Sequence, residues 1–283
     1  MAGKLSTART VVDLRKRVAR WKRDGRKTAV VPTMGALHEG HLSLVDCALQ
    51  HADRVVATIF LNPTQFAEGE DLDTYPGSLD TDLAMLRKRK AHLAFVPAVS
   101  EMYPAAFSTS VSVKGPAAAR LEDRFRPHFF TGVATVVTKL LNQAQCDYAI
   151  FGEKDYQQLM TVTQMAQDLD IPTRIIGAET IRETDGLAMS SRNAYLSQEE
   201  RDLAPRIHET LRQAADSLRD GQAVPGIQRR ARASLRKAGF KVDYVEARNA
   251  VTLAKPENPA AEPLRLLAAA WLGQTRLIDN IAV

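Results

Sequence analysis

Short β-branched apolar runs alternate with longer helical patterns over the first 180 residues, and this alternation constrains the fold more than any other feature. The apolar runs cover residues 28–32, 54–61, 93–96, 148–151 and 173–176, and helical periodicity covers 41–51, 79–89, 131–143 and 156–168. Strands that alternate with helices pair in parallel, because each helix crosses back over the sheet. We therefore expect an α/β fold with a doubly wound, parallel, Rossmann-like sheet.

The pattern changes after Ser197. Residues 198–219 predict one long charged helix and residues 225–238 another, whereas residues 242–247, 264–271 and 275–281 predict strands. This order is typical of a smaller α+β domain. We expect two domains, residues 1–180 and residues 181–283.

Charge and composition disfavour several classes of protein. The 38 Lys and Arg residues are interspersed with 33 Asp and Glu, and the basic runs lack the interleaved aromatics of a nucleic-acid surface. No segment reaches the roughly 20 apolar residues that a membrane helix needs. With two widely spaced cysteines, this composition favours a cytoplasmic protein without nucleic-acid or membrane partners.

Two histidines flank a glycine where the first strand gives way to a helix, in the segment His38-Glu39-Gly40-His41. Ligands of doubly wound sheets bind at this end of the strands, and a helix N-terminus suits a phosphate chain. Imidazoles there can donate hydrogen bonds to oxygens that gain charge as pyrophosphate leaves. The competing interpretation is a pair of surface histidines at a helix cap.

Further polar residues follow later strands. Asn62 and Gln65 come after the second, and Gly152-Glu153-Lys154-Asp155 with Gln158 after the fourth. A glutamine can grip a hydroxyl or carboxylate, and a lysine can reach phosphate, although turn and helix-start roles explain the same residues.

Two weaker signals complete the pattern. Ser190-Ser191-Arg192 supplies two hydroxyls and a guanidinium, which is anion-binding chemistry. Asp82 or Asp80 is a candidate ligand for nucleotide-bound Mg²⁺, and helix-start carboxylates explain them equally well.

Together, the His-Glu-Gly-His and Met-Ser-Ser-Arg segments resemble the paired signatures of the nucleotidylyltransferase and class I synthetase superfamily. Longer motifs resemble the pantothenate synthetase family within it, over nearly the whole chain. These are Val-Pro-Thr-Met-Gly-Ala-Leu-His-Glu-Gly-His, Phe-Leu-Asn-Pro-Thr-Gln-Phe, Phe-Gly-Glu-Lys-Asp-Tyr-Gln-Gln-Leu, Leu-Ala-Met-Ser-Ser-Arg-Asn, and the C-terminal Ala-Ala-Trp-Leu-Gly and Arg-Leu-Ile-Asp-Asn.

This resemblance implies an ATP-dependent, AMP-forming ligase. Pantoate would attack the α-phosphate of ATP to give pantoyl adenylate and pyrophosphate, and β-alanine would then attack the acyl carbon and release AMP. It also implies Mg²⁺ as a cofactor, a homodimer, and a C-terminal domain that acts as a lid.

The resemblance further implies the site residues. His41 and His38, with Lys154, would be catalytic. Gln65 would contact pantoate and β-alanine, and Gln158 pantoate. The residues that would bind ATP are Met34, Gly35, Ala36, Leu37, His38, Glu39, Gly40, His41, Gly152, Glu153, Lys154, Asp155, Ile181, Met189, Ser190, Ser191 and Arg192.

The chain departs from the family pattern at one histidine. The family usually reads Arg-Pro-Gly-His-Phe, but this chain reads Arg126-Pro127-His128-Phe129-Phe130, so the histidine is displaced by one position and we assign His128 no role.

Two rival functions stay open. A nucleotidylyltransferase would keep the mixed anhydride as product, but it gives no reason for Gln65 and Gln158. An RNA-binding or nucleotide-binding regulator would have only the net charge of +5 in its favour, and salt-dependent RNA affinity without ATP hydrolysis would indicate it.

Overall fold

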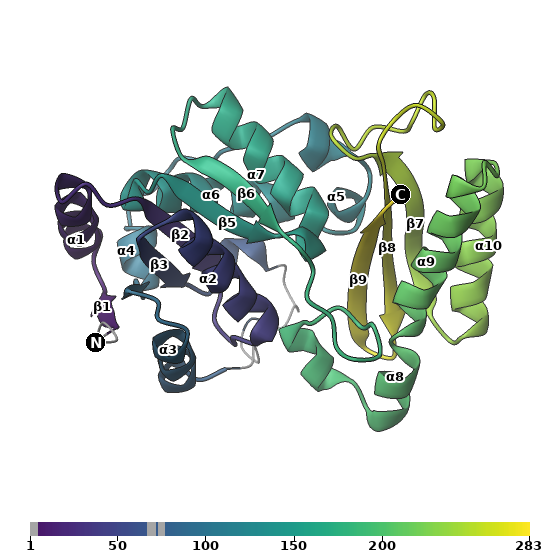
Figure 1. Cartoon of the computed structure of the whole chain (residues 1–283), viewed down its shortest axis with the longest axis horizontal. Coiled ribbons are helices and arrows are strands. Elements are labelled where there is room, and N and C mark those ends of the chain that lie inside the picture. The colour runs from purple at the N-terminus through teal and green to yellow at the C-terminus, as the bar shows by residue number, and fades with distance from the viewer. Residues whose placement is uncertain (1–4, 67–71, 73–76) are drawn as a thin grey trace. The chain divides into compact units, whose positions relative to one another are not determined.

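The computed structural model describes residues 5–66, 72 and 77–283 of the chain. These residues form two compact units (Figure 1). The first contains the chain up to Glu153 together with Thr161–Glu179, and the second contains Lys154–Met160 and Thr180–Val283. The C-terminal unit thus includes a short segment from the start of a helix that the sequence places in the N-terminal domain. The division of the chain into functional domains at residue 180 stays a prediction.

The first unit is built on a parallel sheet with the strand order β1-β4-β3-β2-β5-β6. Strand β2 lies in the middle, where Thr28 pairs with Arg54 of β3 and Ala29 pairs with Tyr148 of β5. The strands are β1 (Ser6–Ala8), β2 (Thr28–Thr33), β3 (Arg54–Ile59), β4 (Leu93–Phe95), β5 (Tyr148–Gly152) and β6 (Arg174–Ala178).

Helices connect these strands. The longer ones are α1 (Val11–Arg23), α2 (Glu39–His51), α3 (Leu79–Lys88), α6 (Phe129–Ala144) and α7 (Tyr156–Asp168). Short helical segments are η1 (Pro63–Gln65), α4 (Val99–Met102), η2 (Gly115–Ala118), α5 (Glu122–Phe125) and η3 (Glu153–Asp155).

Both faces of the parallel sheet are buried. One set of alternate strand residues, including Val31 and Ala57, packs with α2 and α3 in one core cluster. The other set, including Val30 and Phe95, is equally buried, and helix α1 packs against α6. Burial on both faces explains why these strands are continuous apolar runs rather than alternating ones.

The second unit contains an antiparallel sheet of order β7-β8-β9, whose strands are β7 (Lys241–Asn249), β8 (Leu264–Leu272) and β9 (Thr275–Ala282). Helices α9 (Arg206–Arg219) and α10 (Val224–Lys237) pack on one face of it. Preceding them are η4 (Ser191–Tyr195) and α8 (Gln198–Leu203). The predicted fold class, a doubly wound parallel sheet with a smaller α+β C-terminal domain, is confirmed.

Two details differ from the sequence prediction. Residues 198–219 were expected to form one helix, but the chain breaks into α8 and α9 because Pro205 has no N–H to donate to the carbonyl of Arg201. The sequence analysis does not predict strand β1. In the part of the chain that the structure describes, no helix is both long and apolar enough to cross a membrane.

Helix α6 packs against η1 through Gly132, and this contact predicts an unusual response to alanine. A Cβ atom at Gly132 would collide with the main-chain oxygen of Thr64 and lie 2.9 Å from its carbonyl carbon. We expect Gly132→Ala to lower the free energy of unfolding by about 1–3 kcal/mol, as overpacking does. Urea denaturation measures it.

The matched control is Gly226→Ala, since Gly226 also lies in the first turn of a helix and its Cβ would meet Arg230 at an ordinary 3.5 Å. Alanine there should raise the free energy of unfolding by up to about 1 kcal/mol. Stabilisation by both substitutions would contradict the packing described for α6.

Candidate functional site

The order of the strands reverses between β2 and β5, which defines the switch point of the parallel sheet. From β2 the chain continues to β3 and β4 on one side, and it later adds β5 and β6 on the other. Ligands of open parallel sheets bind outside the carboxyl ends of the strands at such a point. Residues 34–38 follow β2, and Glu153 follows β5 after Gly152. Several of the expected ATP-binding residues therefore lie at this edge of the first unit.

The loop between β2 and α2 has an unusual backbone. Gly35 has φ of +88° and Ala36 has φ of 52°, so two successive residues occupy the left-handed region. A Cβ at Gly35 would lie 3.1 Å from Asp82 Oδ2 and 3.3 Å from Ile59 Cγ2. Both the backbone angle and the tight space therefore favour glycine at this position.

Asp82, in the first turn of α3, holds this loop by its main chain. Its Oδ2 accepts a hydrogen bond from Ala36 N at 3.0 Å, and its Oδ1 accepts one from Leu37 N at 2.8 Å. The side chain is 3% exposed. Burial raises the pKa of Asp82, and the two main-chain hydrogen bonds oppose that rise. The magnesium role expected for Asp82 stays a prediction, and the contacts observed are those that shape the loop.

His38 is the N-cap of α2, and its contacts define its tautomer. Its Nδ1 accepts a hydrogen bond from Gly40 N at 3.1 Å, which requires that Nδ1 carry no proton. The proton of the neutral ring is therefore on Nε2, so Nε2 can act only as a hydrogen-bond donor. The His41 ring lies beside it, with a centroid distance of 4.1 Å and an interplanar angle of 44°. The structure thus brings both predicted histidines together at the positive end of a helix dipole.

Helix α3 also contacts helix α2 through Arg89, at the C-terminal end of α3. Arg89 forms one ion pair with Glu39, which lies between the two histidines in sequence, and another with Asp46 at 2.7 Å. These pairs are partly exposed, so each contributes little to stability. Together with Asp82, however, they fix α3 against both the loop and the helix that follows it.

Gln65 lies at the end of η1, next to Asn62, a buried side chain that bonds several polar neighbours. Asn62 is 1% exposed, and its Nδ2 donates to Gln65 Oε1 at 2.9 Å. Its Oδ1 accepts from the Tyr103 hydroxyl at 2.9 Å and from Thr64 Oγ1 at 3.0 Å. Because Gln65 Oε1 accepts from Asn62, its Nε2 is left as the donor available to a ligand. Asn62 therefore supports Gln65.

Lys154 and Gln158 lie in the short segment of the second unit where η3 leads into α7. The Lys154 ammonium is 3.9 Å from Asp155 Oδ2. The main-chain oxygen of Lys154 accepts a hydrogen bond from Asn280 Nδ2 at 2.8 Å. Gln158 follows one helical turn later and is half-buried. Their spacing of four residues suits side chains on one face of a helix.

The remaining expected nucleotide contacts also lie in the second unit, on a tight hairpin. Met189 N donates to Ile181 O at 3.0 Å, and Arg182 pairs with Ala188 in an antiparallel bridge. Ser190 caps η4 by accepting from Arg192 N at 3.3 Å. The structure therefore brings Ile181 together with Met189–Arg192, although the two are well separated in sequence.

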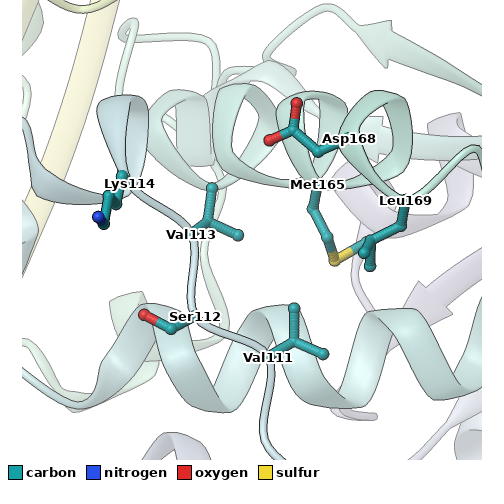
Figure 2. Close-up of a pocket in the computed structure, with 7 residues that line it drawn as sticks. All are labelled: Val111, Ser112, Val113, Lys114, Met165, Asp168 and Leu169. Atoms are coloured by element: carbon teal, nitrogen blue, oxygen red, sulfur yellow. The ribbon is translucent and has the colours of Figure 1, made fainter.

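Other features lie apart from these groups. His128 precedes α6 and is exposed. A pocket of about 280 Å³ (Figure 2) is lined by none of the predicted site residues. Its walls are Val111, Ser112, Val113, Lys114, Met165, Asp168 and Leu169. Within residues 5–66, 72 and 77–283, no three His, Cys, Asp or Glu side chains come together as a protein-held metal site would need.

Known proteins match this chain along nearly its whole length. Residues 6–282 match the family described as Pantoate-beta-alanine ligase. The chain belongs to the pantoate–β-alanine ligase family. It is 56% identical over 275 residues to a pantothenate synthetase of Mesorhizobium japonicum, covering 97% of this chain and 96% of that one. It is 52% identical over 276 residues to pantothenate synthetase 2 of Bradyrhizobium diazoefficiens, covering 98% of each.

Solved structures of the family have the same fold. A pantothenate synthetase of Thermus thermophilus superposes with a TM-score of 0.91 at 42% identity, covering 98% of each chain. The pantoate–β-alanine ligase of Francisella tularensis, complexed with β-γ ATP and β-alanine, superposes with a TM-score of 0.82 at 33% identity, covering 99% of this chain and 98% of that one.

The sequence did not predict which side chains hold the expected site residues of this ligase in position. The sequence predicts a metal role for Asp82 and no role for Arg182, Asp279 or Asn280, although the last two end the Arg-Leu-Ile-Asp-Asn motif. A signal was present for the last two, because a polar Asp-Asn pair interrupts the apolar C-terminal strand. Buried polar residues of this kind need partners, so the pair indicates a bonded network.

The Asp82 contacts predict that a neutral isostere will loosen the loop before His38. In Asp82→Asn, one side-chain position becomes an N–H group that faces a main-chain N–H. We expect the free energy of unfolding to fall by about 1–3 kcal/mol and hydrogen exchange in residues 34–42 to speed up.

Asp80→Asn is the control, because Asp80 lies in the same turn of α3 but is exposed. It should change stability by less than about 0.5 kcal/mol. Equal effects of the two substitutions would show that Asp82 does not hold the loop.

Proposed function

We propose that this chain condenses pantoate with β-alanine to give pantothenate, using ATP and forming pantoyl adenylate as the intermediate. Family membership and the ATP and β-alanine in the Francisella tularensis structure support the overall reaction. The single observation that carries the mechanism is the pair of adjacent histidines at the N-terminus of α2, at the switch point of a parallel sheet.

The first step activates the carboxylate. A pantoate carboxylate oxygen forms a bond to the α-phosphorus of ATP, and the bond from that phosphorus to the bridging oxygen of the β-phosphate breaks. Pyrophosphate leaves with the electron pair and gains negative charge on its oxygens. Activation is needed because a free carboxylate would have to expel oxide, whereas an acyl adenylate expels AMP.

Charge stabilisation is the task that these residues can perform in the first step. The N-terminus of α2 attracts phosphate oxygens, and His38 Nε2 is a donor because its Nδ1 is already engaged by Gly40. We assign His41 as the proton donor toward the departing pyrophosphate, beside His38, and Lys154 as a mobile positive charge. The segments Met34–His41, Gly152–Asp155, Ile181 and Met189–Arg192 are proposed to bind the nucleotide.

The second step forms the amide. The neutral amine of β-alanine attacks the acyl carbon of pantoyl adenylate, the bond from that carbon to the adenylate oxygen breaks, and AMP leaves with the electron pair. The nitrogen then gives its extra proton to solvent water. We assign Gln65 to hold pantoate and β-alanine, since its Nε2 is left as a donor by the bond from Asn62, and Gln158 to hold pantoate.

Magnesium is proposed to accompany the ATP phosphates. Asp82 fits poorly as its ligand, because the carboxylate is buried and both oxygens accept main-chain hydrogen bonds. Mg²⁺ keeps several waters and needs room for them. No step of this mechanism therefore uses a metal held by the protein. The homodimer and the lid role of the C-terminal domain are proposed from the family resemblance alone, and the cytoplasmic location is proposed from the composition.

The assignment of His41 is tested by following pyrophosphate with ATP, Mg²⁺ and pantoate, before and after β-alanine is added. The wild-type chain should release pyrophosphate with pantoate alone and form the amide only with β-alanine. His41→Ala should slow pyrophosphate release by a factor of about 10²–10⁴, because the charge on the leaving group loses a donor.

The matched control is His51→Ala, at the other end of the same helix. Its rate should stay within about twofold of the wild type. Absence of pantoate-dependent pyrophosphate from a folded, ATP-binding wild-type protein would overturn the proposed function. Transfer of AMP to a phosphate acceptor would indicate a nucleotidylyltransferase, and RNA binding without turnover a regulator.

The role of Gln65 is tested by an isosteric change. Gln65→Glu keeps an oxygen that accepts from Asn62, so the fold should be retained. It replaces the donor by a negative charge that repels the pantoate carboxylate. We expect KM for pantoate to rise about tenfold to a hundredfold, measured by steady-state kinetics. An unchanged KM for both pantoate and β-alanine would remove Gln65 from the substrate site.

A further inference from the structure

Two adjacent residues of β9, Asp279 and Asn280, are buried although both are polar. Asp279 is 2% exposed and Asn280 is 3% exposed. Successive residues of a strand point to opposite faces of the sheet. Asp279 contacts Arg182, which lies between the expected nucleotide contacts Ile181 and Met189, and Asn280 contacts the expected nucleotide contact Lys154; all of these residues belong to the second unit.

Asp279 anchors the hairpin that precedes Met189–Arg192. Its two oxygens accept from Arg182, Oδ2 from Nη1 at 2.7 Å and Oδ1 from Nη2 at 2.8 Å, in a two-point pair. Burial alone would raise the pKa of Asp279, but the nearby His208, whose Nδ1 is 3.5 Å from Oδ2, and the Arg182 guanidinium outweigh burial and hold that pKa below its ordinary value. The carboxylate is therefore charged when it holds Arg182.

Arg182 also bonds other residues of the hairpin. Its Nη1 also donates to Gly186 O at 3.0 Å, at the tip of the hairpin. Its main chain forms the bridge with Ala188, next to the bond from Met189 N to Ile181 O. The guanidinium thus ties the strand β9 to the turn that presents Met189 and the residues after it.

Asn280 anchors the other segment, at Lys154. Its Oδ1 accepts from Arg265 Nε at 2.6 Å, and its Nδ2 donates to Lys154 O at 2.8 Å. Arginine can only donate and a carbonyl can only accept, so these partners require a side chain with one acceptor and one donor. Asparagine meets this requirement, whereas aspartate of the same shape does not. The Arg265 guanidinium also lies 4.1 Å from the ring centroid of Tyr156, which begins α7.

The two anchors are themselves joined. Asn280 N donates to Asp279 Oδ1 at 2.7 Å, and Arg182 Nη2 lies 3.3 Å from Asn280 O. A shift of Asp279 therefore disturbs the contacts of Asn280, and a shift of Asn280 disturbs those of Asp279.

We propose that Asp279 and Asn280 are positioning residues for ATP, which set the Ile181–Arg192 hairpin and the main chain of Lys154 in a fixed mutual arrangement. This inference rests on the proposed function, because it takes these two segments as nucleotide contacts. Neither residue needs to touch the nucleotide. Preorganised contacts of this kind reduce the ordering that binding would otherwise cost.

The test compares Asn280→Asp and Asp279→Asn with a matched control, Asp243→Asn. The control breaks another largely buried Arg–Asp pair of the same sheet, which joins Asp243 of β7 to Arg276 of β9 at 2.8 Å. Pyrophosphate release gives KM for ATP and for pantoate separately, and thermal unfolding gives the stability of each variant.

We expect KM for ATP to rise about tenfold or more in both test variants, with KM for pantoate within about twofold of the wild type. Asp243→Asn should lose stability but keep its KM for ATP. A KM for ATP within about twofold of the wild type in the test variants, or an equal rise in the control, would overturn the inference. Arg182→Lys, which keeps the charge and loses the two-point pair, replaces Asp279→Asn if that variant does not fold.

The outcome is separable from that of the proposed function. If the wild-type chain releases no pantoate-dependent pyrophosphate, the increase in melting temperature on adding ATP replaces KM as the readout. That increase should be smaller in the two test variants than in the wild type and the control. An equal increase in all four proteins would contradict the positioning role.

Discussion

The parallel pairing of β2 between β3 and β5 is the constraint on which the candidate site depends. Its register, from Thr28 opposite Arg54 to Thr33 opposite Ile59, makes β2 and β3 end at the same edge of the sheet. The loops that carry His38 and Gln65 therefore both begin at that edge. A slip of one residue would reverse the faces of the whole strand and disrupt the packing of its apolar side chains, so burial on both faces specifies where these loops start.

Buried polar side chains then hold the individual loops, and they do so through main-chain atoms or through a neighbouring polar side chain. Asp82 accepts from two backbone amides before His38, Asn62 orients the Gln65 amide, and Asn280 donates to the Lys154 carbonyl. Burying such groups is costly unless every partner is present. The same requirement makes each arrangement specific, because few other side chains satisfy the same donors and acceptors.

The sequence predicts those parts of the structure that depend on local pattern. Continuous apolar runs such as residues 28–32 predict buried strands, and the spacing of His38 and His41 after one of them predicts a helix cap at the sheet edge. The break at Pro205 was readable from proline chemistry, but the charged periodicity on both sides of it obscured the signal. Asp82 shows the remaining limit, because a carboxylate in a helix start has the same local signature whether it faces water or a loop 45 residues earlier in the chain. Only the packing of α3 against that loop decides between them.

The central claim is that pantoate is activated as an acyl adenylate, and the fate of its carboxylate oxygens tests this most directly. The chain is supplied with pantoate labelled with ¹⁸O in the carboxylate, ATP and β-alanine, and the products are analysed by mass spectrometry. The account predicts one labelled oxygen in AMP and the other in the new amide, because the attacking oxygen leaves with the α-phosphorus. Unlabelled AMP, with the label in inorganic phosphate or in water, would contradict it.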